Sequence, residues 1–431
     1  MKLIKIYTAI ISALFLASCS MSDYTYRAVR PTQSQKIYPP AGMVYIPAGS
    51  VMIGQSNTNG QDSSAMKKVS LSAFFMDKTE VSNRQYRQFI NWVRDSIAIT
   101  NYLKDKSFFQ PTHGKDNAAQ NQINWTAIGG SQTFWKSNNS KIRAKLKPMY
   151  TSANKLDNSL FNYEYEVVAT DPNDKTGRKK IIKKEVINVW PDEAVWEKDF
   201  PNSQNDVMVT SYFTNPLFDD YPVVGVTWKQ ARAFASWRSK ISNKYTNKFI
   251  NPNIITLPMD LPTEAQWAYV AAQTSESPIK KTKYSNTTTS SINYKQGEGT
   301  YSEDGYTYTS PVLAYSPNQF GLYNLAGNVS EWTLNTYSEN SLAFIHDLNP
   351  VLLYDAKDND PEIKKRKVIK GGSWKDPEIL VAPSTRSAEF QDVAKSYIGF
   401  RCVMPAPDIM EVQQPKKSTR QKTKLSNLAI K

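Results

Sequence analysis

The chain has 431 residues, 12% of them aromatic, and 53 basic against 39 acidic residues give it a net charge of +14. This length suffices for one large domain with insertions, and the aromatic content argues against a disordered chain. Only two cysteines (Cys19 and Cys402) and two histidines (His113 and His346) are present, which excludes a disulfide-rich fold and argues against a metal–histidine centre or a histidine triad.

The N-terminus has the features of a bacterial lipoprotein signal. Lys2 and Lys5 precede an apolar run, and Leu16-Ala17-Ser18-Cys19 matches a lipobox. The run is too short to span a bilayer, so we expect residues 1–18 to be a cleaved signal peptide and Cys19 to carry the lipid anchor. The alternative is a buried cysteine near a disordered start. We expect the periplasmic face of the outer membrane as location, which makes a nucleic-acid partner improbable.

Residues 19–40 are polar and proline-containing, which is typical of a tether. The domain is expected over residues 41–404, with strands at its start and in residues 69–75, 368–374 and 397–404. Three Ser/Thr-x-x-Gln capping boxes predict helix starts: Ser82 with Gln85, Thr227 with Gln230 and Thr263 with Gln266. Residues 405–431 are basic and polar, and we interpret them as a flexible tail.

Two long insertions interrupt the domain, at about residues 100–215 and 275–310. The first begins with a polar segment, residues 108–139, that we expect to be a loop. It continues into a predicted hairpin with strands in residues 163–168 and 181–190. A basic group on this hairpin is a candidate contact for an acidic partner or anionic lipid, although for such a cluster taken alone a solvated face is the commoner explanation. Its members are Lys179, Lys180, Lys183 and Lys184.

The stretch Gly321–Thr333, GLYNLAGNVSEWT, is one of a series of motifs. It is a strand-and-turn element in which Gly327 is expected at positive φ. The others are Phe75–Val81, Tyr221–Trp228, Leu261–Trp267, Gly371–Trp374 and Gly399–Arg401. In this order they resemble the formylglycine-generating-enzyme (sulfatase-modifying-factor) domain. The resemblance implies a loop-rich α+β single domain related to C-type lectins.

The enzymes of the resembled family bind copper through two cysteines shortly after the Gly-Gly-Ser-aromatic motif. Here residues 375–381 read KDPEILV, without a cysteine. Thiolate is the ligand that selects Cu(I), so the resemblance implies a protein that has lost catalysis. Cys402, in the Gly-Phe-Arg-Cys segment, is expected to be a small buried hydrophobe.

The resemblance also implies a structural calcium ion at the segment Gly327–Glu331. Asn328 and Glu331 supply the hard oxygen atoms that calcium prefers. The alternative is that Asn328 caps a turn while Glu331 pairs with Arg386 or Arg401. Arg401 itself is expected to be a buried structural arginine that binds loop carbonyls.

A finer resemblance separates this chain from the enzymes. The run Phe75–Ser96, together with Trp190–Asp192 and Phe218–Val226, is similar to gliding-motility lipoproteins of Bacteroidetes, of the PorK/GldK type. The similarity extends over Gly42–Met404. It implies a non-catalytic subunit of a periplasmic ring in type IX secretion, assembled from copies of itself with a PorN/GldN-type partner. The alternative is a lipid-anchored module that binds glycan or peptidoglycan on a degenerate enzyme fold.

Overall fold

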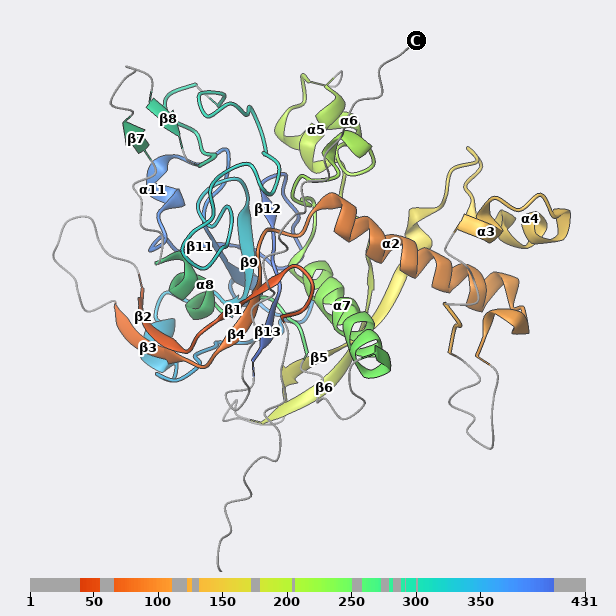
Figure 1. The fold of residues 1–431 in the computed structure, drawn as a ribbon, viewed down its shortest axis with the longest axis horizontal. Helices are drawn as coiled ribbons and strands as arrows, with labels where there is room; N and C mark the ends of the chain where they lie inside the picture. Colours follow the sequence, from red (N-terminus) through yellow and green to blue (C-terminus); the bar gives the residue numbers. More distant parts are fainter. Residues whose placement is uncertain are drawn as a thin grey trace, which may run out of the picture. The chain divides into compact units, whose positions relative to one another are not determined.

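A four-stranded mixed sheet carries the motif stretch and positions the candidate site. Its strand order is β11-β10-β9-β12, with β9 antiparallel to β10 and parallel to β12 (Figure 1). The strands are β9 (Ser330–Thr336), β10 (Arg366–Lys370), β11 (Ser387–Phe390) and β12 (Ile398–Gly399). Because β9 follows directly on the turn of Gly321–Val329, the motif stretch is confirmed as a turn and strand.

The computed structural model describes residues 39–54, 66–110, 122–125, 132–171, 179–203, 206–249, 258–272, 279–281, 288–290, 292–299 and 301–406. The predicted signal peptide, Cys19, most of the tether, His113 and residues 407–431 of the predicted tail lie outside these ranges. Among the described residues, no helix combines the length and the apolar character that crossing a bilayer requires.

Smaller sheets surround the mixed sheet. A three-stranded sheet has the order β1-β4-β13, with both pairings antiparallel. Three two-stranded antiparallel sheets pair β2 with β3, β5 with β6, and β7 with β8. These strands are β1 (Met43–Ile46), β2 (Gly49–Ile53), β3 (Lys67–Leu71), β4 (Phe74–Asp77), β5 (Asn162–Thr170), β6 (Lys180–Asn188), β7 (Ile279–Lys281), β8 (Thr288–Ser290) and β13 (Val403–Pro405).

The three predicted helix starts are confirmed. Ser82 caps α2 (Asn83–Ile97) and Thr263 caps α8 (Glu264–Ala271), each in a complete capping box. The same exchange occurs before α7 (Trp228–Phe249), where Thr227 N–H donates to Gln230 Oε1 (2.8 Å) and Gln230 N–H to Thr227 Oγ1 (3.2 Å). Each box satisfies backbone donors that a helix start leaves unpaired.

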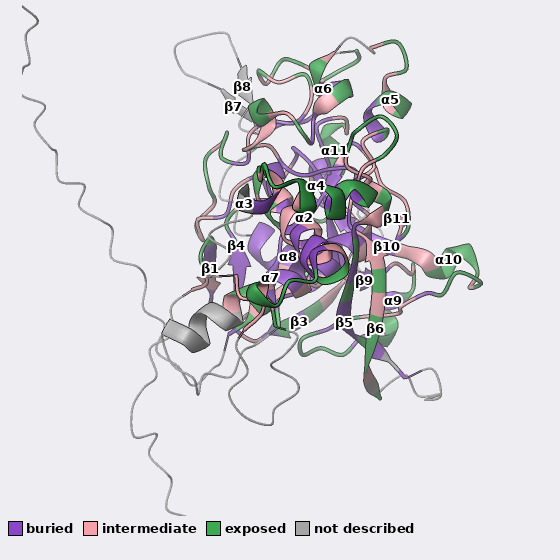
Figure 2. Ribbon diagram, turned by 90° about the vertical axis from the view of Figure 1, so that its right-hand side faces the viewer, coloured by how far each residue is buried: buried purple, intermediate pink, exposed green. Residues whose placement is uncertain are grey.

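The core lies between the sheets and helices α7 and α8, which are largely buried (Figure 2). Aromatic rings fill much of it: Trp196, Trp228, Trp267, Trp332 and Trp374 are among the largest fully buried side chains. Tyr86 and Phe89 of α2 pack against Phe234 of α7, with ring centroids 5.6 and 5.9 Å away. The α+β class is confirmed.

The long connections contain more structure than the sequence indicated. The predicted loop of residues 108–139 includes α3 (Gln132–Trp135), and Pro405 belongs to β13 rather than to the tail. The other short helices are α4 (Ser140–Leu146), α5 (Val195–Asp199), α6 (Val207–Ser211), α9 (Ser341–Phe344), α10 (Glu362–Lys365) and α11 (Glu378–Val381), with a π-helix at Ala98–Leu103 and 3₁₀ turns at Lys106–Phe108, Lys147–Met149, Asn158–Leu160 and Pro216–Phe218.

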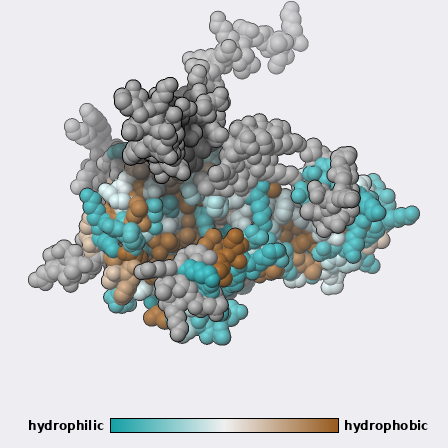
Figure 3. Space-filling view, turned by 90° about the horizontal axis from the view of Figure 1, so that it is seen from below, coloured by the Kyte–Doolittle hydropathy of each residue, from teal (hydrophilic) through white to brown (hydrophobic). Residues whose placement is uncertain are grey.

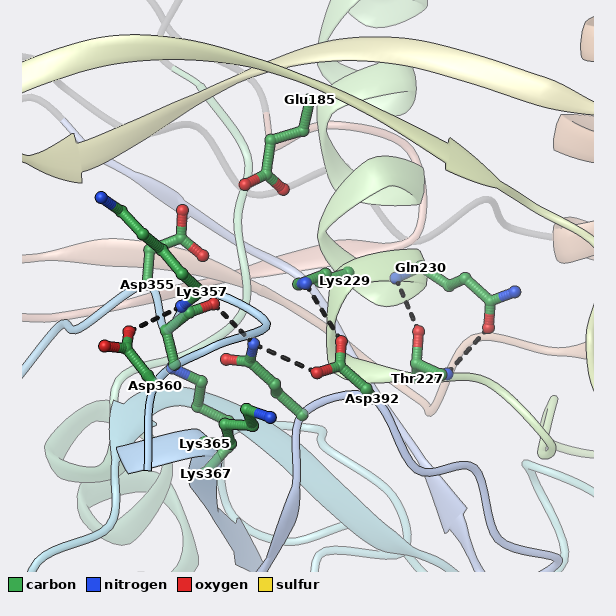
Figure 4. Close-up of polar contacts among 12 residues, drawn as sticks. Glu185, Thr227, Lys229, Gln230, Asp355, Lys357, Asp360, Lys365, Lys367 and Asp392 are labelled. Atoms are coloured by element: carbon green, nitrogen blue, oxygen red, sulfur yellow. Dashed lines mark hydrogen bonds and ion pairs between the residues drawn. The ribbon is translucent and has the colours of Figure 1, made fainter. Parts of the chain in front are cut away.

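The predicted hairpin of the first insertion is confirmed as β5–β6. One face packs on the domain, since Tyr163 contacts Phe89 (ring centroids 5.2 Å) and Tyr165 Oη donates to the Lys229 carbonyl (3.2 Å). Glu185 of β6 faces the loop that carries Asp355 (Figure 4). The insertion is therefore docked on the domain.

Gly327 occupies a position that excludes any side chain. Its φ is +76°, and an added Cβ would lie 2.1 Å from the Asn293 carbonyl oxygen. Gly321 in the same turn also has positive φ (+82°), but nothing lies within 4 Å of its Cβ position.

These two glycines give a matched pair of variants. Gly327→Ala is expected to lower the free energy of unfolding by more than about 3 kcal/mol, because it adds a backbone clash to the cost of positive φ. Gly321→Ala is expected to cost about 1 kcal/mol, the conformational term alone. Denaturant unfolding measures both values. Equal losses in the two variants would contradict this role for Gly327.

Candidate functional site

A buried ion pair lies between the motif turn and the sheets. Arg401 is fully buried, and its guanidinium donates to both carboxylate oxygens of Glu331 at 2.6–2.9 Å. Trp267 Nε1 donates to Glu331 Oε2 at 2.9 Å. The pair thus joins β9, helix α8 and the segment between β12 and β13.

Arg401 also binds main-chain oxygens, as the sequence predicted. It donates to the carbonyls of Asp77 (3.2 Å), Lys78 (3.3 Å) and Tyr323 (2.8 Å). These carbonyls belong to the end of β4, the residue after it and the motif turn. Arg386, the other partner considered for Glu331, pairs instead with Glu264 at 2.7 Å.

A second carboxylate, Glu80, is fully buried beside this pair. Its oxygens accept hydrogen bonds from the side-chain amides of Asn328 (2.8 Å) and Asn324 (3.2 Å). Burial raises the pKa of Glu80 to about 8; Arg401 opposes the shift and repulsion from Glu331 adds to it. Two carboxylates therefore share one guanidinium inside the protein.

The Asn328 side chain is saturated by protein groups. Its Oδ1 accepts from the Ser310 N–H (2.8 Å) and the Asn293 amide (3.4 Å), and its Nδ2 also donates to the Ser310 carbonyl at 3.3 Å. The backbone of Asn328 has φ +62°, so Asn328 is itself a turn residue in the left-handed region. This geometry favours the alternative in which Asn328 is a structural turn residue.

Two buried side-chain oxygen atoms near Asn328 lack a hydrogen-bond partner among the described residues. They are Asn324 Oδ1 and Asn293 Oδ1. Buried polar atoms are normally satisfied by protein, water or an ion. Amide oxygens of this kind are ligands that calcium accepts, but in the described part of the chain no three His, Cys, Asp or Glu side chains gather to hold a metal ion. Both oxygens of Glu331 are already bound by Arg401, and one of them also by Trp267. Calcium at this turn stays a prediction.

The segment where the resembled enzymes carry their cysteines is occupied by structural contacts. Ser373 Oγ donates to Asp376 Oδ2 (2.6 Å), and Val381 is buried against Gly372. Cys402 is fully buried, and burial raises the pKa of its thiol well above the ordinary value, which confirms it as a buried cysteine. Neither the segment nor Cys402 presents a reactive thiolate.

Aromatic rings pack around Trp374 at this place. The ring of Trp374 stacks on that of Trp196 (6.0 Å, 15°) and contacts Phe200 (5.8 Å) and Tyr308 (5.6 Å). Lys375, the next residue, extends over the ring of Tyr397 at 4.3 Å. Aromatic rings therefore fill much of the space around Trp374.

The hairpin lysines have acidic neighbours within the chain. Lys179 pairs with Asp171 (2.8 Å), Lys184 with Glu164 (3.0 Å), and Lys183 with both Glu185 (2.7 Å) and Asp355 (3.0 Å). Lys180 lies in β6, and its side chain is outside the described part of the structure. Three of the four lysines named from the sequence are therefore compensated locally, which weakens the argument from charge clustering.

Sequence reasoning missed Glu80, Asn324 and Asn293 as members of the site. Asn324 lies in the motif stretch, and Glu80 is the last but one residue of the motif Phe75–Val81. Both therefore belong to the same series of motifs, which was the signal available in the sequence. Asn293 lies in the second insertion, where the sequence gives no such signal.

The three segments of the finer resemblance lie against one another. Asn83 N–H donates to the Tyr221 carbonyl (2.9 Å) and Val223 N–H to the Val81 carbonyl (2.8 Å). Asp192 N–H donates to the Gly225 carbonyl at 2.7 Å. These segments, which are far apart in the sequence, form one continuous part of the fold.

Glu80→Gln tests the buried carboxylate. Because the folded pKa of about 8 lies above the ordinary 4.5, the folded protein holds a proton on Glu80 that the unfolded chain releases, so the contribution of Glu80 to the free energy of unfolding falls as pH rises from about 5 to 8. The amide does not titrate. As pH rises from about 5 to 8, the free energy of unfolding of Glu80→Gln should therefore increase relative to that of the wild type, by up to about 1.4 kcal/mol for each pH unit.

Denaturant unfolding at several pH values, with a chelator present, measures this difference. The exposed Glu339→Gln is the surface control. A difference between Glu80→Gln and wild type that stays constant from pH 5 to 8 would show that Glu80 is ionised in the folded protein.

Comparisons with known proteins agree with this geometry at the level of the domain. The "Formylglycine-generating enzyme" of Bos taurus is 25% identical over 374 residues, covering 84% of this chain and 75% of the relative. That of Thermomonospora curvata is 31% identical over 195 residues, covering 42% and 55%. The "Inactive C-alpha-formylglycine-generating enzyme 2" of Bos taurus is 30% identical over 195 residues, covering 43% and 51%.

The matched part spans about half the length of the last two relatives. Among solved structures, PvdO from Pseudomonas aeruginosa is similar with a TM-score of 0.44 and 17% identity, covering 84% of this chain and 94% of that one. The model of the "Sulfatase-modifying factor enzyme 1-like domain" matches residues 28–406. Because this match extends over most of the chain, the protein belongs to the sulfatase-modifying factor enzyme 1-like family.

Proposed function

We propose that this protein is a non-catalytic, lipid-anchored scaffold subunit at the periplasmic face of the outer membrane. In this proposal Cys19 carries the lipid, and copies of the chain assemble with a PorN/GldN-type partner into the ring of a type IX secretion or gliding machinery. The finer resemblance and the lipobox are what support the location and the partner.

One observation carries the non-catalytic part of the proposal. The segment after Trp374 has no cysteine, and the surrounding space is packed with the rings of Trp196, Phe200 and Tyr308. Copper chemistry of the family type needs thiolates with access to oxygen and substrate. A relative named as inactive indicates that the domain also occurs without the activity.

The assembly part is supported by the position of the resembling segments. Residues 75–96, 190–192 and 218–226 contact one another through main-chain hydrogen bonds. Salt bridges reinforce this contact: Arg84 pairs with Asp220 (3.0 Å), and Arg87 pairs with Asp219. A fixed surface of this kind suits a subunit that repeats one contact many times.

Calcium is the cofactor that we propose, in a structural role. Near the turn lie the carboxylates of Glu80 and Glu331, the guanidinium of Arg401, and the buried oxygens of Asn324 and Asn293 that have no partner among the described residues. When bound, calcium would offset the second carboxylate and satisfy these oxygens.

Removal of calcium tests that role. Adding calcium to the chelated protein is expected to raise the midpoint of thermal unfolding by at least about 4 °C, because an ion that binds only the folded state stabilises it. Magnesium at the same concentration is the control, since it demands a smaller octahedral cage. An unchanged unfolding midpoint after calcium is added would contradict a structural calcium site in this protein.

Composition of the native complex tests the scaffold. The full chain, tagged after Lys431, is extracted from membranes in mild detergent and analysed by mass spectrometry. We expect a second periplasmic protein in a fixed ratio and an acyl modification on Cys19. Cys19→Ser is the matched control, which should leave the membrane fraction. Recovery of wild type without a stoichiometric partner would contradict the proposal.

A further inference from the structure

Three β-branched aliphatic side chains are exposed on the outer face of the hairpin β5–β6. Val168 is 48% exposed, Ile182 73% and Val186 66%, whereas Tyr163 and Tyr165 on the other face are buried. Figure 2 accordingly shows β6 in the exposed and intermediate colours. Figure 3 views the lower side of Figure 1, where the hairpin lies, and shows hydrophobic surface interrupted by hydrophilic surface.

The register of the hairpin arranges charges on the same face. Val168 pairs with Ile182, and one step along that face Glu166 pairs with Lys184. Lys184 makes its ion pair diagonally with Glu164 at 3.0 Å. Glu166 is exposed and has no ion-pair partner among the described residues. The face thus combines the apolar pair Val168–Ile182 with the carboxylates of Glu164 and Glu166 on β5 and the ammonium of Lys184 on β6, and Val186 lies level with Glu164.

At two levels of the register, Val168–Ile182 and Glu166–Lys184, this pattern is complementary to itself. A two-fold axis parallel to the strands, between two facing hairpins, places β5 of one copy over β6 of the other while keeping each residue at its level. Glu166 then faces the partner's Lys184, and Val168 faces the partner's Ile182. Both contacts occur twice, as in every isologous interface.

We propose that the outer face of the hairpin β5–β6 is a docking surface for the same face of a second copy of this chain. The apolar pairs leave water and the charge pairs fix the relative direction of the two copies. This inference does not rest on the proposed secretion role, because it uses only the exposure, register and charge of the hairpin.

The size of the face sets the strength of the contact. Strands of nine residues extend about 30 Å, so a face two strands wide buries about 300 Å² on each copy. Stable interfaces bury about 800 Å² on each partner. The pairing is therefore weak in dilute solution, and it is favoured where copies are concentrated, as on a membrane surface.

Reversing one charge at a time distinguishes a loss of contact between copies from a loss of stability within the hairpin. Glu166→Lys and Lys184→Glu are made separately in the full chain, and chemical crosslinking in detergent is measured against concentration. Each variant alone places like charges across the two-fold axis, so we expect the crosslinked dimer to require about tenfold higher concentration than wild type.

An equal mixture of the two variants gives the decisive readout. Across the axis, the side chain introduced by Glu166→Lys meets the one introduced by Lys184→Glu, while the native Lys184 of the first chain meets the native Glu166 of the second. Opposite charges therefore face each other at both contacts, and mixed dimers should form within about threefold of the wild-type concentration. An effect confined to each hairpin's own stability cannot be restored by mixing folded chains.

Two further variants complete the test. Ile182→Asp should abolish the dimer, whereas Leu313→Asp, at an exposed aliphatic residue (61%) away from the hairpin, should leave it unchanged. Thermal unfolding checks that each variant is folded. The proposal is overturned if the wild-type chain gives no crosslinked dimer at any concentration, or if mixing the reversed variants restores nothing.

Discussion

The fold depends on a buried arginine that holds together segments from three parts of the chain. Arg401 reaches Glu331 on β9 and the carbonyls at the end of β4 and in the motif turn. Removing one partner of such a pair leaves the other charge buried without compensation, which costs about 3–5 kcal/mol. This requirement explains why four of the motifs occur together in the chain, because each supplies one side of the same polar cluster: Phe75–Val81, Leu261–Trp267, Gly321–Thr333 and Gly399–Arg401.

The surplus carboxylate gives the cluster a second property. Glu80 is buried next to Glu331, and the charge of Arg401 acts on both carboxylates. A proton on Glu80 or a bound cation resolves the imbalance, and the two solutions differ in their dependence on pH and on calcium. The stability of this cluster is therefore expected to depend on pH and on calcium.

In the proposed function, the same framework is kept without the chemistry that the resembled enzymes place on it. Main-chain geometry around Gly372 and Trp374 is preserved by close packing, since a Cβ at Gly372 would lie 2.7 Å from the Leu380 carbonyl oxygen. Rings then occupy the space beside Trp374. A rigid domain whose centre is filled by aromatic rings can hold contact surfaces in fixed positions. The outer face of the hairpin β5–β6 is one such surface.

Local features were the part that the sequence could predict. Capping boxes at Ser82, Thr227 and Thr263 depend on residues three apart, and the positive φ of Gly327 depends on its own turn. Short helices such as α3 were missed because four residues carry too little periodicity.

Contacts between distant residues were the part that it could not predict. The hydrogen bond between Asn328 and Glu80 spans 248 residues, and the ion pair between Lys183 and Asp355 spans 172. In the sequence, Glu80 looks like any surface acid and the hairpin lysines look like an uncompensated basic group. Their neutralising partners are visible only once the chain is folded.

Electron microscopy of the assembly, extracted from native membranes without crosslinking, tests the central claim most directly. The scaffold account predicts closed rings of many copies, with density for a second protein and with the lipid-bearing ends on one side. Single particles of one or two chains, with no larger form under any mild detergent, would contradict it. Such particles would favour the lipid-anchored module that binds glycan or peptidoglycan.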